Sequence, residues 1–297
     1  MKTTFISLLI LFLLCNDFNM IAQSRGNIKL NIIVFGGHPD DADNKAGGTA
    51  ALFAEMGHRV KFVSVTNGDA GHFELGGAAL AEIRRKEAEE AGRQLKIAAY
   101  VVLDNHDGKL LPTLDIRDQI IREIRNWEAD IVLTHRPVDY HPDHRYTGVL
   151  VQDAAYVVIV PNITPDTPPL KKNPVFLYLE DHFQKPTPFQ PDIAVDITNT
   201  FDKKINALDA HKSQMYEWLP WTNNTLELVP ENEDKRKEWL SNNRSGSITP
   251  GERESLKKWY GKEKGESVEY AESFEICEYG RQPSEEEIRK LFPMLNQ

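Results

Sequence analysis

Short apolar, β-branched runs alternate with helix-like stretches along the chain, and this alternation limits the possible folds more than any other feature. The strand-like runs cover 28–37, 59–69, 98–108 and 129–137, and two more follow at 173–181 and 192–198. Helical spacing of apolar residues occurs at 44–58, 78–95, 113–128 and 143–160, and a further helix is expected over 199–213. Repeated units of this kind predict a Rossmann-like α/β fold, in which a mostly parallel sheet carries helices on both faces.

The alternating pattern stops near residue 215. From there to residue 297 the chain is polar, rich in Pro and Asn and only locally helical. A capping box between Ser284 and Glu287 predicts one short helix close to its end. We therefore expect an α/β domain over 28–214, followed by a C-terminal extension or small lobe over 215–297.

The N-terminus indicates export. Lys2 precedes the apolar run "FISLLILFLLC", and cleavage after Ala22 is plausible, so 1–22 is predicted to be a secretory signal peptide. A retained N-terminal anchor is the alternative. No later stretch has the 18 apolar residues of a spanning helix, so no stable membrane span is expected after removal of the signal. The expected location is periplasmic or extracellular.

The net charge argues against a nucleic-acid-binding protein, and the cysteine content argues against a disulfide-bonded fold. A net charge of −10 argues against binding to nucleic acid, which normally requires a basic surface. Loss of 1–22 would remove Cys15 and leave only Cys277, so the fold would contain no intramolecular disulfide.

Polar clusters follow the strand-like runs, where open α/β sheets bind their ligands. Of nine histidines, only His58 and His211 lie outside these clusters. This distribution predicts a metal or catalytic site at the carboxyl ends of the strands. The clusters contain His38, Asp40, Asp41, Asp43, Asn67, Asp69, His72, Asp104, Asn105, His106, Asp107, His135, Arg136, Asp139, Tyr140, His141, Asp143, His144, Glu180, Asp181 and His182.

Two of the clusters hold similar motifs, "HPDD" at 38–41 and "HPDH" at 141–144. A mixed His/Asp set that leaves one coordination position for water is typical of catalytic zinc. The two motifs offer more than the three protein ligands that such a site needs. The surplus groups are then available as general base, general acid and partners that orient the ligands. Zn²⁺ is the expected cofactor, and another divalent metal such as Fe²⁺ is the alternative.

The chain resembles the PIG-L/LmbE family over roughly residues 30–200. The resemblance rests on these two motifs, on "GGT", which opens the helix after "HPDD", and on "IRRKEAEEAGRQL" in the next helix. Members of that family are zinc-dependent deacetylases of N-acetylglucosaminyl compounds. The resemblance implies that the zinc ligands are His38, Asp41 and His144. It also implies that Asp40 is the general base.

Further roles follow from the same resemblance. His141 would help to stabilise the oxyanion, with Asp143 as its orienting partner. Arg84 and Asp107 would contact the substrate, and Tyr140 and His182 from the strand-end clusters complete the candidate substrate contacts. The family usually carries a Glu shortly after its Asp pair; this chain has "DDAD" there, and the role of Asp43 is left open.

The expected function is removal of an N-acetyl group from an N-acetylglucosamine-type sugar or glycoconjugate by metal-activated water. The expected partner is therefore a small molecule or glycan that carries an N-acetyl group. One alternative is a metal-dependent hydrolase of another amide or an ester. Another is a non-catalytic exported glycan-binding module.

Single residues have structural alternatives as well. Asp40 could be only a helix N-cap, and His135 could be a core histidine. Trp218 and Trp221 could stack on a sugar or anchor the C-terminal segment. Substrate choice is expected to depend on 215–297.

Overall fold

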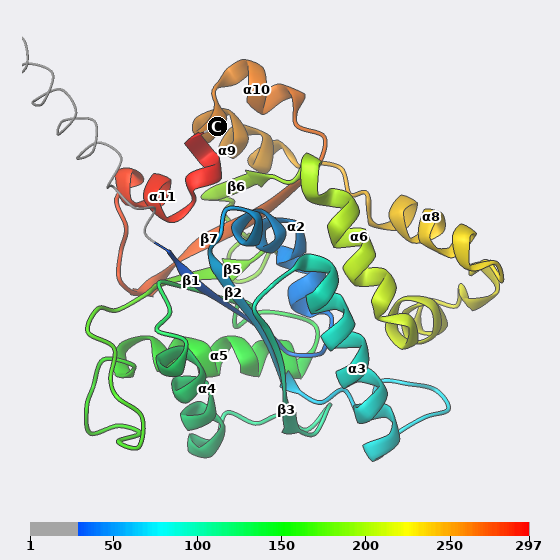
Figure 1. Ribbon diagram of the computed structural model, residues 1–297, viewed down its shortest axis with the longest axis horizontal. Helices are drawn as coiled ribbons and strands as arrows, with labels where there is room; N and C mark the ends of the chain where they lie inside the picture. The colour runs from blue at the N-terminus through cyan, green and yellow to red at the C-terminus, as the bar shows by residue number, and fades with distance from the viewer. Residues whose placement is uncertain (1–28, 297) are drawn as a thin grey trace, which may run out of the picture.

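The computed structural model describes residues 29–296. Within them, seven strands form one sheet in the order β3-β2-β1-β4-β5-β7-β6 (Figure 1). β1 to β5 pair in parallel, whereas β7 runs antiparallel to both of its neighbours, β5 and β6. The predicted α/β fold with a mostly parallel sheet is confirmed. The strands are β1 (Asn31–Gly36), β2 (Arg59–Thr66), β3 (Ala99–Asn105), β4 (Ile131–Thr134), β5 (Val175–Leu179), β6 (Ile193–Asp196) and β7 (Ala271–Gly280).

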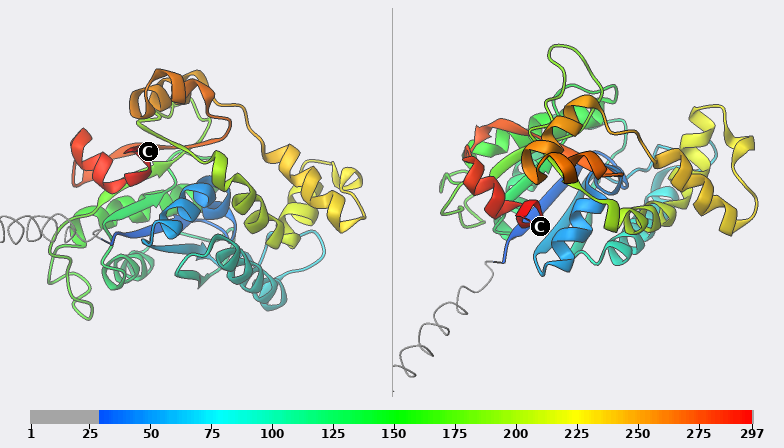
Figure 2. Two further views of the ribbon diagram at one scale, coloured as in Figure 1. Left: turned by 45° about the horizontal axis from the view of Figure 1, so that its top comes forward. Right: turned by 90° about the horizontal axis from the view of Figure 1, so that it is seen from above.

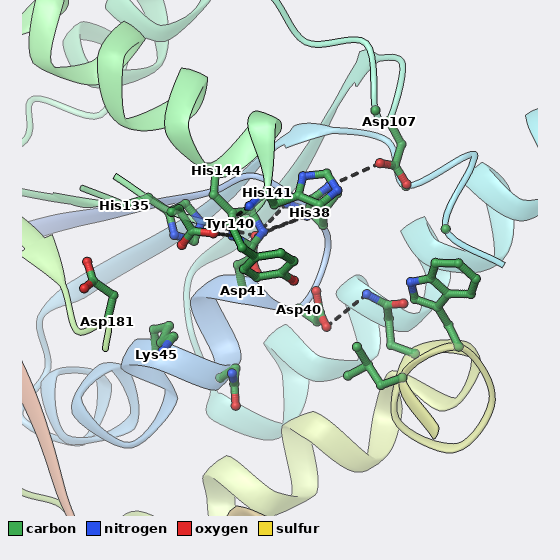
Figure 3. A pocket seen from close by; sticks show the side chains of 18 of the residues that line it. His38, Asp40, Asp41, Lys45, Asp107, His135, Tyr140, His141, His144 and Asp181 are labelled. Atoms are coloured by element: carbon green, nitrogen blue, oxygen red, sulfur yellow. Dashed lines mark hydrogen bonds and ion pairs between the residues drawn. The ribbon is translucent and has the colours of Figure 1, made fainter. Parts of the chain in front are cut away.

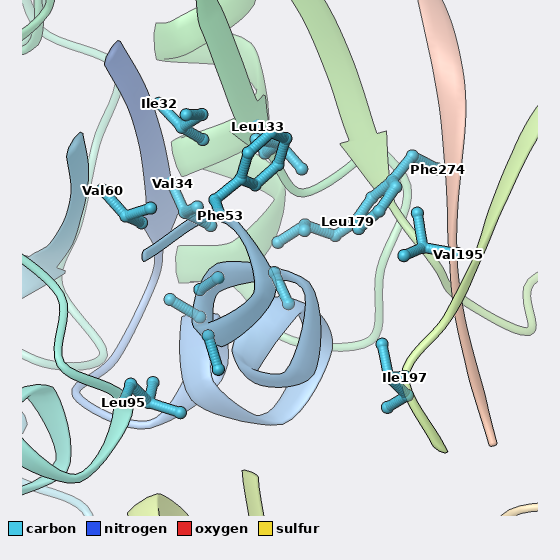
Figure 4. Packing of buried hydrophobic residues seen from close by; sticks show 14 of the residues in the cluster. Ile32, Val34, Phe53, Val60, Leu95, Leu133, Leu179, Val195, Ile197 and Phe274 are labelled. Carbon is cyan, nitrogen blue, oxygen red and sulfur yellow. The ribbon is translucent and has the colours of Figure 1, made fainter. Parts of the chain in front are cut away.

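Helices cover both faces of the sheet because its strands are apolar on both sides. In β1, Ile32 and Val34 belong to the buried cluster that contains Phe53 of α2 (Figure 4). Ile33 points to the opposite face and joins the cluster that contains Ile120 of α4. α2, α3 and α6 therefore cover one face, and α4 and α5 cover the other. These helices are α2 (Asp41–Glu55), α3 (Gly77–Leu95), α4 (Leu114–Asn126), α5 (Pro142–Val157) and α6 (Phe201–Ala210).

The segment beyond residue 214 contributes surface helices and one strand inside the sheet. α8 packs beside α6, α9 packs against β6, and β7 lies between β5 and β6 (Figure 2). The predicted capping box at Ser284 and Glu287 is present and opens α11. A domain boundary near residue 214 stays a prediction. The segment holds the end of the π-helical turn η2 (Ser213–Trp218), then α7 (Leu219–Thr222), η3 (Leu226–Leu228), α8 (Glu233–Arg244), α9 (Pro250–Tyr260), α10 (Lys262–Ser267), β7, α11 (Glu285–Leu291) and η4 (Pro293–Asn296).

The predicted signal peptide, 1–22, and Cys15 lie outside the described residues. Between residues 29 and 296, no helix has both the length and the apolar character needed to cross a membrane. Cys277 is a buried free thiol, with its Sγ 3.1 Å from the hydroxyl of Tyr178.

Candidate active site

A cavity of about 490 Å³ lies at the carboxyl ends of the parallel strands (Figure 3). This is the edge at which the strand-end clusters predicted a site. Nine of the ten predicted site residues line the cavity, and Asp143 lies behind the wall. The nine are His38, Asp40, Asp41, Arg84, Asp107, Tyr140, His141, His144 and His182.

His38, Asp41 and His144 bring three donor atoms together at the cavity wall. His38 Nδ1 lies 3.0 Å from His144 Nε2 and 3.6 Å from Asp41 Oδ2. Asp41 Oδ2 and His144 Nε2 are 3.3 Å apart. A tetrahedral zinc ion with bonds of about 2.0–2.2 Å separates its ligand atoms by about 3.3–3.6 Å. Two of the three separations lie in this range and the third, between His38 and His144, is 0.3 Å shorter, so small shifts of the two rings would place the three donors on one face of such a tetrahedron and leave the fourth position for water or substrate.

The charges of these side chains suit a cation. Burial disfavours the charged form of His144, but Asp41 and Asp139 outweigh it and raise the pKa of His144 to about 9. Burial likewise opposes ionisation of Asp41, yet His144 and His135 hold the pKa of that carboxyl well below its usual range. A metal ion would displace the proton from His144 and take over the role of counter-ion to Asp41.

Two further residues fix the orientation of His144. Asp139 Oδ1 lies 3.0 Å from His144 Nδ1, so it holds the proton on that nitrogen and leaves Nε2 for the metal. His135 stacks on the ring of His144, with ring centroids 4.3 Å apart. The Nε2 of His135 lies 3.2 Å from Oδ2 of Asp41 and 3.2 Å from the backbone nitrogen of Gly37. His135 is thus buried, as the structural alternative supposed, but it contacts a metal-site residue. The sequence did not predict that Asp139 orients His144. Asp139 lies in the loop before α5, where the spacing between two residues does not determine whether their side chains meet.

Asp40 occupies the N-cap position of α2, but its carboxylate does not cap the helix. Its backbone has a φ of 142°, which is strained for a residue other than glycine. The Oδ2 of Asp40 accepts a hydrogen bond from Gln214 Nε2 at 3.1 Å. Burial and the charge of Asp41 raise the pKa of Asp40 to about 6. The N-cap alternative therefore does not explain this side chain, which faces the cavity (Figure 3).

His141 caps α5, and the cap bond determines which ring nitrogen carries the proton. Its Nδ1 accepts from the backbone N–H of Asp143 at 3.2 Å, so the neutral ring carries its proton on Nε2. Burial and the neighbouring His38 lower the pKa of His141 and favour this neutral form. His141 therefore offers an N–H donor within the cavity, with its ring centroid 4.5 Å from that of His38.

The carboxylate of Asp143 lies elsewhere. It accepts hydrogen bonds from the backbone N–H groups of Gly108 at 2.6 Å and Leu110 at 3.3 Å, and its Oδ2 is 3.4 Å from His38 Nε2. Asp143 contacts His141 through its backbone N–H. Its carboxylate holds the loop after β3 against His38.

The predicted substrate contacts differ in exposure. Arg84 is buried and donates from Nη2 to the carbonyl of Gly71 at 2.7 Å, which fixes the loop after β2. Asp107 Oδ1 lies 3.1 Å from His38 Nε2. Tyr140 is 72% exposed over the mouth of the cavity, and the side chain of His182 is exposed at its rim.

A buried network lies behind Asp40. Asp43 is fully buried and accepts hydrogen bonds from the hydroxyl of Tyr100 at 2.7 Å and from His211 Nε2 at 3.2 Å. Asp43 is therefore a structural carboxylate, remote from solvent.

The tryptophans link two parts of the chain. Trp221 stacks on Trp218, with centroids 5.3 Å apart, and on Phe73, with centroids 5.6 Å apart. These contacts anchor the segment after α6 to the loop after β2. Trp218 also lines the cavity.

Comparisons with known proteins identify similar sequences over the segment that contains both motifs. A family model described as PIG-L, GlcNAc-PI de-N-acetylase, matches residues 33–155, which include both motifs. A diacetylchitobiose deacetylase of Thermococcus kodakarensis is 29% identical over 195 residues, covering 62% of this chain and 70% of the relative. A 4-oxalmesaconate hydratase of Pseudomonas putida is 27% identical over 203 residues, covering 66% of this chain and 78% of the relative.

The fold agrees over a longer stretch. The solved structure of N,N'-diacetylchitobiose deacetylase from Pyrococcus horikoshii, in complex with an inhibitor, superposes with a TM-score of 0.61 at 25% identity. The match covers 88% of this chain and 92% of the other. The matched segment and the paired motifs assign residues 33–155 to the PIG-L/LmbE family, and the rest of the chain shares the fold of the diacetylchitobiose deacetylase structure.

Proposed function

We propose that this protein is a metal-dependent deacetylase that hydrolyses the N-acetyl group of an N-acetylglucosamine-type sugar or glycoconjugate. One observation carries the proposal. A single cavity contains three donor atoms suited to a metal, the buried carboxylate of Asp40, which does not cap its helix, and the N–H donor of neutral His141. Because the relatives include a hydratase as well as a deacetylase, the reaction is argued from these side chains.

His38, Asp41 and His144 would hold the metal, and we propose Zn²⁺, with Fe²⁺ as the alternative. The donor set of two imidazoles and one carboxylate suits either ion. When bound, the metal would lower the pKa of a water molecule and polarise the acetamide carbonyl.

The other side chains supply proton transfer and charge stabilisation. Gln214 engages only Oδ2 of Asp40, so Oδ1 is left to accept a proton from the attacking water. His141 donates its Nε2–H to the oxygen of the acetamide as negative charge develops there, a contribution typically worth a few kcal/mol. Asp40 then returns its proton to the departing amine, and the products are acetate and the free amino sugar.

The experiment is release of amine and acetate from a panel of N-acetylhexosamines, with esters of the same sugars for comparison, before and after chelation. We expect amine release that is lost on chelation and restored by Zn²⁺. Asp40→Asn should keep the metal and lose turnover. Turnover of esters alone would indicate hydrolysis of another bond, and sugar binding without any turnover would indicate a glycan-binding module; either result overturns the proposal.

We also propose that the chain is exported. The support is the apolar run after Lys2 and the plausible cleavage site after Ala22. N-terminal sequencing of the protein from its producing cell, together with fractionation, tests this. An intact Met1 in the cytoplasmic fraction would contradict it.

A further inference from the structure

A second cavity, of about 320 Å³, adjoins the first. The two share part of their walls, since Asn44, Lys45, His182 and Arg244 line both. Each is within the size range of small-ligand sites. A substrate with its N-acetylated unit at the metal site could therefore extend into the second cavity.

Two of the shared residues are cations without a counter-ion. Among the side chains that the structure describes, neither Lys45 nor Arg244 has a carboxylate oxygen within 4.0 Å. The Nη2 of Arg244 contacts only the sulfur of Met215, at 3.3 Å. Figure 3 shows Lys45 on α2, on the side of the cavity where Asp181 lies and away from Asp107. In a chain of net charge −10, two cations without an acidic partner beside one cavity call for an explanation.

Several other charged groups in or beside these cavities form ion pairs. Arg136 binds Asp181 through two hydrogen bonds, at 2.6 and 2.9 Å. Lys204 pairs with Glu272 at 2.9 Å, and the carboxylate of Glu272 also accepts the backbone N–H groups of Gly48 and Thr49.

The two remaining carboxylates of the second cavity, those of Glu180 and Glu252, form no ion pair with Lys45 or Arg244. The carboxylate of Glu252 accepts hydrogen bonds from the hydroxyls of Thr249 at 2.9 Å and Ser273 at 3.0 Å. Glu180 lies near Lys45 without forming an ion pair, and burial raises the pKa of its carboxyl, which weakens it as a counter-ion. The positive charge of Lys45 and Arg244 is thus left available to a ligand.

Arg244 is also placed close to the reacting groups. It ends α8, in the segment beyond the family match at 33–155. Its contact residue Met215 follows Gln214 in η2, and Gln214 is the hydrogen-bond donor to Asp40. Arg244 and Asp40 both line the first cavity. A ligand group held by Arg244 would therefore lie in the same cavity as the acetamide.

We propose that Lys45 and Arg244 bind an anionic group of the substrate, so that the preferred substrate is an acidic N-acetylated glycan. The charged unit would occupy the second cavity, next to the N-acetylated sugar at the metal site. A carboxylate, sulfate or phosphate meets this requirement, because a guanidinium and an ammonium together supply charge-assisted hydrogen bonds to any of them. The inference rests on the proposed function for the identity of the reacting sugar.

The test compares three classes of oligosaccharide. The neutral probe is N,N'-diacetylchitobiose, the carboxylate probe is a disaccharide of N-acetylglucosamine and glucuronic acid, and the third arm holds sulfated and phosphorylated N-acetylglucosamine. Binding to Asp40→Asn is measured by calorimetry, and kcat/KM is measured with the metal-loaded enzyme. The variants Lys45→Met and Arg244→Met remove each charge, and Arg244→Lys restores one. Lys237→Met, an exposed residue of the same helix α8, is the matched control.

We expect at least one acidic class to bind about tenfold or more tightly than the neutral probe. Lys45→Met or Arg244→Met should each reduce that preference about tenfold, Arg244→Lys should recover part of it, and Lys237→Met should leave it unchanged. Added salt should weaken the preference. Equal binding of neutral and acidic probes, or a preference that both Met variants retain, overturns the inference.

The binding arm separates this inference from the proposed function. Equal binding with deacetylation of both probes would leave the function standing without the acidic preference. Preferential acidic binding without amine release from any probe would refute the function and leave the anion site in place.

Discussion

Replacing Asp139 measures how strongly the proposed metal site depends on a residue outside the proposed set of ligands. The Oδ1 of Asp139 lies 3.0 Å from His144 Nδ1 and also accepts the backbone N–H of His141 at 3.0 Å. Loss of a partner that orients a metal-binding histidine costs about 10- to 100-fold in metal affinity, or roughly 1.4 to 2.8 kcal/mol. Asp139→Ala removes both contacts and should lie near the upper end. Asp139→Asn keeps an acceptor oxygen but not its charge, and should lie near the lower end.

The assay is competition for Zn²⁺ between the protein and a chromophoric chelator, with circular dichroism to verify that each variant is folded. Asp202→Asn, which removes an exposed carboxylate on α6, controls for the change in net charge. The reasoning is refuted if folded Asp139→Ala binds Zn²⁺ within twofold of the wild type, or if Asp139→Asn is the weaker of the two.

Three further predictions concern catalysis and stability. His141→Asn keeps a capping group but removes the Nε2–H donor, so kcat should fall about 10²- to 10³-fold with metal content unchanged; a fall of less than tenfold contradicts this. Arg125→Met should lower the free energy of unfolding in urea by roughly 3 to 5 kcal/mol, because the buried guanidinium donates hydrogen bonds to six backbone carbonyls. Arg122→Met on the same helix, which removes only the ion pair of a half-buried side chain with Asp166, should change it little. Burial lowers the pKa of His58, whose neutral Nδ1 accepts the N–H of Leu30. The contribution of this hydrogen bond to the free energy of unfolding is therefore present above pH about 6.5 and is lost as the pH falls through the lowered pKa. A pKa of His58 above 6.5 in an NMR titration would contradict this.

The order and type of elements up to residue 213 were predictable because their signal is local. Each apolar run or helical stretch carries its own period, and β1 to β6 and α2 to α6 appear in the predicted order. β7 was not predicted, because its place between β5 and β6 depends on pairing with strands that lie far earlier in the chain.

The same distinction applies to the site. His38, Asp41 and His144 sit in short motifs that a reader can recognise, and the strand ends bring them together. Gln214 contacts Asp40 from 174 positions further along the chain, and Arg244 comes from a segment with no motif. Their roles depend on tertiary packing and could be found only in the structure.

The position of β7 determines the order in which this protein can be completed. Residues 193–196 of β6 are synthesised about 75 positions before their sheet partner, 271–280. Until that partner is made, β6 has no hydrogen-bonded neighbour and β5 presents an open edge, a state that favours slow folding and association with other chains. A truncation before residue 271 would remove a strand from between two others, so the role of the C-terminal segment in substrate choice must be tested by single substitutions.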